Sequence, residues 1–214
     1  MVLSSRDLKE LDSAGWTVVP DGAVHILEVA RSLGIPVPSR FGRGLVDVLE
    51  PISQEKAHPR SLSAIYGLGA FPFHIDTAHW AVPCRYVLLS LAEAVDTSTG
   101  TMLLKWSGLF TQAEQRRLAA AVLLVRNGHR SFYAPILDTQ RGLLRCDPGC
   151  TVPASRDAQE VMTMVAERSG AGAASVHVWS KDDLLIVDNW RTLHSRPPTP
   201  NSSQRRLRRV LVSQ

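Results

Sequence analysis

The sequence has little of several features that mark specialised classes of protein. It has three cysteines, an odd and small number that argues against a disulfide framework. Cys146 and Cys150 are spaced like half of a zinc site, but no second Cys/His pair follows at zinc-finger spacing, so we interpret both as ordinary thiols. The first residues are charged and lack the apolar segment of a secretory signal. The longest apolar run, 118–125, is far shorter than the roughly 20 residues of a membrane helix. We therefore expect a cytoplasmic protein that does not bind a membrane.

Aromatic residues are also scarce, at 6% of the chain. They are not interleaved with basic residues in the way that is typical of proteins that stack nucleic-acid bases. The net charge is nevertheless +4, and four arginines crowd one short run near the C-terminal end, at positions 205, 206, 208 and 209. This run is open to two interpretations, a basic patch for nucleic acid or part of a buried site.

A chain of 214 residues is long enough for one domain with a sizeable core. Hydrophobic periodicity predicts helices over 5–14, 23–33, 112–125 and 155–169. It predicts strands over 16–19, 45–49, 85–91, 101–106, 175–179, 184–187 and 207–212, and a pair of strands over 131–137 and 142–146.

This order does not alternate regularly between strand and helix, so we do not expect a parallel Rossmann sheet. Short buried strands with helices packed outside favour an α+β, mostly β fold, with a double-stranded β-helix (jelly-roll) core and flanking helices. We expect a single domain over residues 1–214, in which 1–60 form an N-terminal α/β support and 61–214 form the jelly-roll core.

The sequence does contain a candidate metal site. His74 and Asp76 are at positions i and i+2, so on an extended strand their side chains would point to the same face. A buried strand over 184–187 runs into a polar turn that carries His194. On a barrel, that turn would place His194 at the rim, facing the first two residues. Two histidines and one carboxylate on one face are the ligand set of non-haem Fe(II) oxygenases, and leave coordination positions open.

The arginine run fits the same site. On a strand, Arg205, Leu207 and Arg209 share one face, while Arg206 and Arg208 share the other. A buried guanidinium needs an anion, and a carboxylate is its best match. We therefore expect one or two carboxylate sites beside the metal, with the other two arginines solvated.

Together these segments resemble the taurine dioxygenase/clavaminate synthase-like family of Fe(II)- and 2-oxoglutarate-dependent oxygenases. The resemblance rests on residues 73–79, 100–101, 188–194 and 205–209, in this order and with these gaps. It implies that His74, Asp76 and His194 hold iron. It also implies that Thr101 and Arg205 bind the distal carboxylate of 2-oxoglutarate.

The resemblance further implies that Arg209 meets an acidic group of the substrate, and Tyr66 is a candidate substrate contact because it is close in sequence to the metal segment. The predicted function is a dioxygenase that uses Fe(II), 2-oxoglutarate and O2. It would oxidise, by default hydroxylate, a small metabolite bearing a carboxylate or an amine, and release succinate and CO2. Two alternatives stay open: a cupin-like metal-binding isomerase or hydrolase, which needs no carboxylate clamp, and a basic nucleic-acid-binding module, which needs all four arginines exposed.

Overall fold

The computed structural model describes residues 2–59, 61–92, 99–199 and 205–214. Its largest element is a six-stranded antiparallel sheet with the order β1–β12–β4–β14–β2, in which β3 also pairs with β14. The strands of this main sheet are β1 (Trp16–Val19), β2 (Ile35–Val37), β3 (Asp47–Leu49), β4 (Tyr86–Leu91), β12 (Leu184–Asp188) and β14 (Leu207–Ser213). Strands from both ends of the chain therefore build one sheet.

Side chains of the central strands alternate between two cores, as the two-residue period of a strand requires. In β4, Leu88 packs on the side of the helices α1 (Ser5–Ala14) and α2 (Ile26–Leu33), whereas Val87 and Leu89 pack on the opposite side. All six residues of β4 are buried. This explains why β4 reads as a nearly continuous apolar run.

Helix α1 has clear sequence signals at both ends. The Ser4 side chain and Asp7 form a reciprocal capping box at its start. Gly15 ends the helix with φ of 87°, and a Cβ there would collide with the Thr192 hydroxyl. A glycine is therefore required where α1 turns into β1.

A second antiparallel sheet with the order β11–β5–β13 faces the main sheet. Its strands are β5 (Thr101–Lys105), β11 (Ser175–His177) and β13 (Thr192–Ser195). Leu103 of this sheet packs with Leu89 and Leu211 of the main sheet in a shared core. The two packed antiparallel sheets with outer helices confirm the predicted jelly-roll fold.

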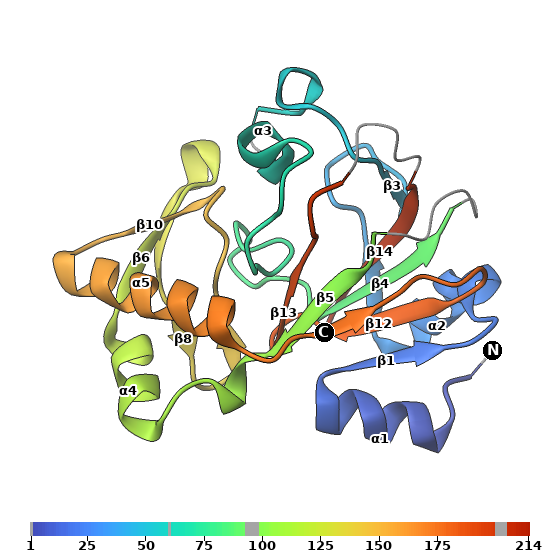
Figure 1. Cartoon of the computed structure of the whole chain (residues 1–214), viewed down its shortest axis with the longest axis horizontal. Coiled ribbons are helices and arrows are strands. Elements are labelled where there is room, and N and C mark those ends of the chain that lie inside the picture. The colour runs from blue at the N-terminus through green and yellow to red at the C-terminus, as the bar shows by residue number, and fades with distance from the viewer. Residues whose placement is uncertain (1, 60, 93–98, 200–204) are drawn as a thin grey trace.

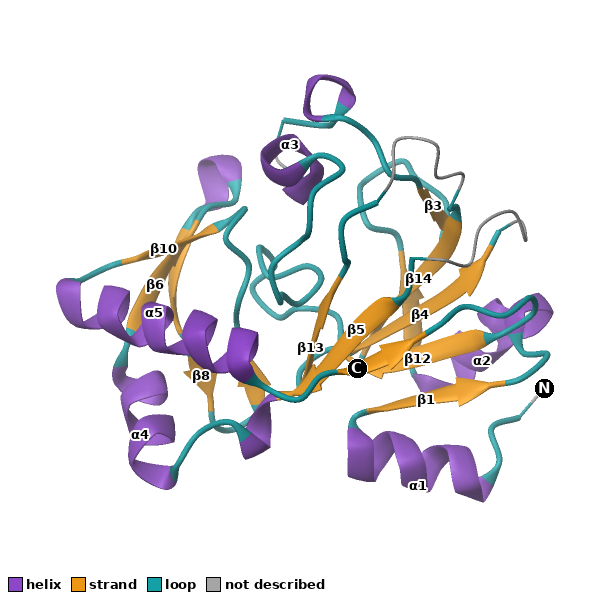
Figure 2. Cartoon of the chain, in the orientation of Figure 1, coloured by secondary structure: helices purple, strands orange, loops and turns teal. Residues whose placement is uncertain are grey.

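The segment between β5 and β11 forms a separate group of elements, on the left of Figure 1. It consists of the sheet β10–β6–β7, the ribbon β8–β9 and the helices α4 and α5, which share one core. Its elements are α4 (Gln112–Ala120), β6 (Val122–Val125), β7 (Phe132–Pro135), β8 (Leu137–Asp138), β9 (Leu143–Leu144), β10 (Thr151–Pro153) and α5 (Arg156–Ala171). Between this group and the main sheet, Figure 2 shows the long loop that runs from α3 (Leu62–Tyr66) to β4.

Two local predictions are wrong. The helix expected over 112–125 ends at Ala120, because Val122–Val125 pairs with β7 and β10 as a strand. For the same reason 131–137 does not pair with 142–146 along its length, and only the short β8–β9 pairing remains. Aliphatic residues such as those of 118–125 fit a buried helix or a buried strand equally well.

Four single-turn 3-10 helices complete the described elements: η1 (Ala23–His25), η2 (Gln54–Lys56), η3 (Trp106–Gly108) and η4 (Gly128–Arg130).

No helix in the described ranges is long and apolar enough to cross a membrane.

Candidate metal and cosubstrate site

The three predicted ligands converge. One ligand atom from each of His74, Asp76 and His194 lies within 4.8 Å of the others. The backbones of the two histidines are paired, since each N–H donates to the other's carbonyl, at 3.0 and 2.9 Å. This pairing places the two imidazole rings side by side, with 4.5 Å between their centroids.

The backbone around these ligands differs from the expectation in two ways. His74 makes only an isolated bridge, and the chain turns at Asp76 instead of continuing as a strand. Thr77 in this turn has φ of 56°, in the left-handed region. His194 lies within strand β13, paired with β5, and not in a turn at the rim. The side chains nevertheless meet.

Asn189 holds the turn at Asp76 in place, a role that no local sequence pattern indicates. Its side-chain oxygen accepts from the backbone N–H of Asp76 at 2.8 Å, and its amide nitrogen donates to the Asp76 carbonyl at 3.0 Å. The same nitrogen donates to the carbonyl of Cys84 at 2.9 Å. Asn189 is fully buried. It therefore connects the segment that carries His194 to the segment that carries the carboxylate ligand.

The two histidines are prepared for a metal in different ways. The Nδ1 of His74 lies 2.9 Å from the carbonyl of Pro72, and because a carbonyl oxygen only accepts, this contact orients the ring and leaves Nε2 as the atom available to a ligand. Burial, and next the neighbouring His74, lower the pKa of His194 to about 3, so its ring is neutral at ordinary pH. A neutral imidazole is the form that binds a metal.

Asp76 is ionised. Burial raises its pKa, but the guanidinium of Arg209 and the two imidazoles outweigh burial, and the net pKa lies below the ordinary value. Arg209 donates to both Asp76 oxygens, at 3.2 and 3.1 Å, and to Asp47 at 2.9 Å. The structure thus brings Arg209 to the site, bonded to the carboxylate ligand and to Asp47 of β3.

Thr101 and Arg205, predicted to act together, are in contact. The Arg205 guanidinium donates to the Thr101 hydroxyl at 3.0 Å, and both residues are buried. Arg206 lies on the outside and pairs with Glu50. The face predicted for Arg205 and Arg209 is the one that Leu207 and Leu211 share in the inner core. The four arginines therefore do not form the single exposed patch that the nucleic-acid alternative requires.

Tyr66 lies one aromatic ring away from the ligands. Its ring packs on Phe71 at 6.1 Å, and Phe71 packs on His74 at 6.2 Å. The guanidinium of Arg196 covers the Phe71 ring at 3.9 Å and donates to the carbonyls of Gly67 and Gly69. Tyr66 thus belongs to a wall beside His74, although it does not touch the three ligands itself.

The donor set fits Fe(II). Two imidazoles and one carboxylate are the facial triad of non-haem iron enzymes, and metal-bound histidines typically make an orienting hydrogen bond such as the one from His74 to the Pro72 carbonyl. The buried pair Thr101–Arg205 fits the distal carboxylate of 2-oxoglutarate, since guanidinium and hydroxyl are the groups that bind such an anion.

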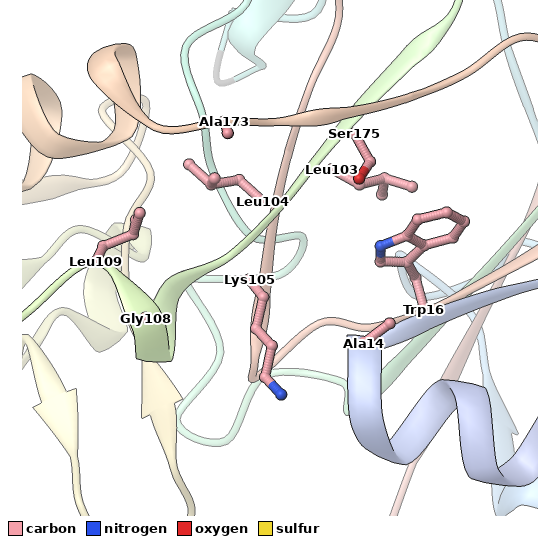
Figure 3. Close-up of a pocket in the computed structure, with 9 residues that line it drawn as sticks. All are labelled: Ala14, Trp16, Leu103, Leu104, Lys105, Gly108, Leu109, Ala173 and Ser175. Atoms are coloured by element: carbon pink, nitrogen blue, oxygen red, sulfur yellow. The ribbon is translucent and has the colours of Figure 1, made fainter.

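A pocket elsewhere on the molecule is a different feature. It lies where the end of α1, strand β5 and the segment after α5 meet, and Figure 3 shows Trp16 and Lys105 among its lining residues. None of the candidate site residues lines it.

Comparisons with known proteins find a family model and solved structures that are similar to this chain. Residues 124–211 match the model of the family described as "Taurine catabolism dioxygenase TauD, TfdA family". A solved structure of asparagine oxygenase in complex with Fe(II), hydroxyasparagine and succinate has a TM-score of 0.77 and 23% identity, over 97% of this chain and 78% of that one. The non-heme iron oxygenase OrfP in complex with Fe and alpha-ketoglutaric acid has a TM-score of 0.75 and 19% identity, over 97% and 78%. None of the curated proteins matches this chain.

The fold and the three converging ligands define the class, which is a jelly-roll protein with the facial triad of non-haem iron enzymes. The family match then confirms the predicted resemblance to the taurine dioxygenase family, over the part of the chain that carries His194 and Arg205.

Proposed function

We propose that this protein is an Fe(II)- and 2-oxoglutarate-dependent oxygenase that oxidises a small molecule. The observation that carries the proposal is the simultaneous presence of a three-ligand centre and a buried Thr101–Arg205 pair. The metal and cosubstrate, when bound, supply oxidative decarboxylation of 2-oxoglutarate to succinate and CO2, coupled to oxidation of the substrate by O2. A cupin-like isomerase or hydrolase does not require a buried Thr101–Arg205 pair, because it binds no distal carboxylate of 2-oxoglutarate.

The residues of this chain bind and orient in this mechanism. His74, Asp76 and His194 would hold the metal, and a set of three protein ligands would leave it able to bind the cosubstrate and O2. Arg205 and Thr101 would bind the distal carboxylate of 2-oxoglutarate and so orient the cosubstrate in the site. His74 and His194 are buried and Asp76 is half-buried, so the site restricts the access of water to the reacting groups.

Arg209 has a double role in this proposal. It keeps Asp76 ionised for metal binding through two hydrogen bonds. Its guanidinium would also meet an acidic group of the substrate, as the family resemblance implies. Asp47 holds Arg209 in position from the other side.

We further infer that the substrate carries an amine, because Asp147 offers an acidic group near the metal. Asp147 follows Cys146, whose carbonyl accepts from the N–H of Ile75 at 2.9 Å, between the first two ligands. Burial raises the pKa of Asp147, and His74 and Asp76 both act on it electrostatically. Within the described ranges, no basic side chain forms an ion pair with Asp147. A cationic amine would supply that partner.

The experiment is a screen of small amino acids for substrate-dependent succinate formation, with the matching acids that lack the amine tested in parallel. The proposal expects turnover only with amines. Asp147→Asn should lower kcat/KM for the amine substrate and leave the Kd of 2-oxoglutarate unchanged. Asp157→Asn, an exposed aspartate in the first turn of α5, is the matched control. Equal activity of Asp147→Asn and wild type would remove the amine assignment.

A further inference from the structure

The Thr101 hydroxyl accepts two hydrogen bonds. The indole Nε1 of Trp179 donates to its oxygen at 3.2 Å, and the Arg205 guanidinium donates to the same oxygen at 3.0 Å. Trp179 is 1% exposed, and Thr101 is 4% exposed. Trp179 lies two residues beyond β11 and outside the segments on which the family resemblance rests.

The direction of these two bonds is fixed by chemistry. An indole N–H is only a donor, and a guanidinium is only a donor, whereas a hydroxyl has two acceptor lone pairs and one proton. Both lone pairs of Thr101 are therefore occupied, and the hydroxyl proton must be given to another acceptor. Among the residues that the structure describes, none accepts a hydrogen bond from Thr101.

We propose that Trp179 is a positioning residue for the cosubstrate: its indole N–H occupies one lone pair of Thr101 and so makes that hydroxyl a dedicated donor to the distal carboxylate of 2-oxoglutarate. The inference rests on the proposed function. Without the Trp179 N–H, one lone pair of the Thr101 hydroxyl is free, and the hydroxyl is able to rotate. Its proton is then no longer directed at the distal carboxylate of 2-oxoglutarate.

The surroundings keep the indole in this orientation. The His177 ring packs edge-on against Trp179, with 4.5 Å between centroids and an angle of 81°. His177 is paired in register with Thr101 across the β11–β5 ladder. The Arg205 guanidinium lies 6.0 Å from the centroid of the Trp179 ring, so the ring also packs beside the second donor. Strand pairing places His177 opposite Thr101, and packing against His177 and Arg205 holds the indole beside the hydroxyl.

The test is binding of two ligands to the Mn(II)-loaded protein, measured by calorimetry without turnover. 2-Oxoglutarate has the distal carboxylate, and 2-oxopentanoate has the same chain length without it. Trp179→Phe keeps a ring in the core and removes the N–H. It should raise the Kd of 2-oxoglutarate about fivefold to tenfold, the loss of one hydrogen bond, and leave the Kd of 2-oxopentanoate unchanged. Trp106→Phe, which removes an indole N–H bonded to the Trp190 carbonyl, is the matched control and should change neither.

If Trp179→Phe raises the Kd of both ligands by the same factor, the role of Trp179 is only structural and the inference is overturned. An unchanged Kd for both ligands would overturn it as well. A wild-type protein that does not prefer 2-oxoglutarate would instead contradict the proposed function. In the Thr101→Val background, Trp179→Phe should have no further effect on 2-oxoglutarate binding, because both act through one hydroxyl. If Trp179→Phe does not fold, Thr101→Val alone decides, and undiminished preference for 2-oxoglutarate in that variant overturns the proposal.

Discussion

Replacing Asn189 with alanine should loosen the metal site and destabilise the fold together. The substitution removes the three hydrogen bonds that the side chain makes to the backbone of Asp76 and Cys84. At about 1 kcal/mol net for each bond, the free energy of unfolding should fall by about 3 kcal/mol. For a chain of this size, this loss corresponds to a decrease in Tm of about 6–12 °C. Thermal unfolding of the metal-free protein, followed by circular dichroism, measures it.

The same variant should also bind the metal less tightly. Asn189 fixes the turn from which Asp76 reaches the metal, and loss of such an outer partner typically costs 10–100-fold in affinity. The matched control is Asn127→Ala, because the side chain of Asn127 makes no capping bond at the start of η4. If Asn189→Ala lowers Tm by less than about 2 °C and leaves the Kd for Co(II), used as a probe metal, unchanged, this reasoning is refuted.

Two further predictions concern the cosubstrate and the pH dependence of stability. Arg205→Gln should raise the Kd of 2-oxoglutarate by roughly 100-fold, because the buried carboxylate loses its cation, while metal affinity stays the same; an unchanged Kd would reassign Arg205. The metal-free protein should lose stability as the pH falls below about 6.5, the ordinary pKa of histidine, because buried His194 has a pKa of about 3 and the unfolded chain binds a proton that the folded chain does not. Urea unfolding at pH 5 and pH 7.5 measures this slope, which should be shallower in His194→Asn, and an equal slope in both proteins would contradict the assignment.

The predictions from the sequence succeeded where one periodicity or one motif decided the outcome. The parity of the last strand put Arg205 and Arg209 on the same side as Leu207, and that side is the inner one. The continuous apolar runs of β4 and β12 indicated strands buried on both faces, and they lie next to each other in the main sheet.

The sequence could not predict contacts that depend on tertiary structure. Asn189 bonds to a residue 113 positions away, and Trp179 bonds to one 78 positions away, and neither lies in a local pattern that implies its partner. The segment 71–80 has strand-like parity, yet Asn189 and the left-handed Thr77 turn it at Asp76. Secondary structure was ambiguous where aliphatic residues continued beyond α4 into β6.

The central claim is that the three ligands hold Fe(II) in a way that lets 2-oxoglutarate chelate it. The most direct measurement is anaerobic titration of the protein with Fe(II) and 2-oxoglutarate, followed by visible absorption. A weak charge-transfer band should appear with wild type and be absent in His74→Ala. No band with the wild-type protein, or an equal band in His74→Ala, would contradict the account.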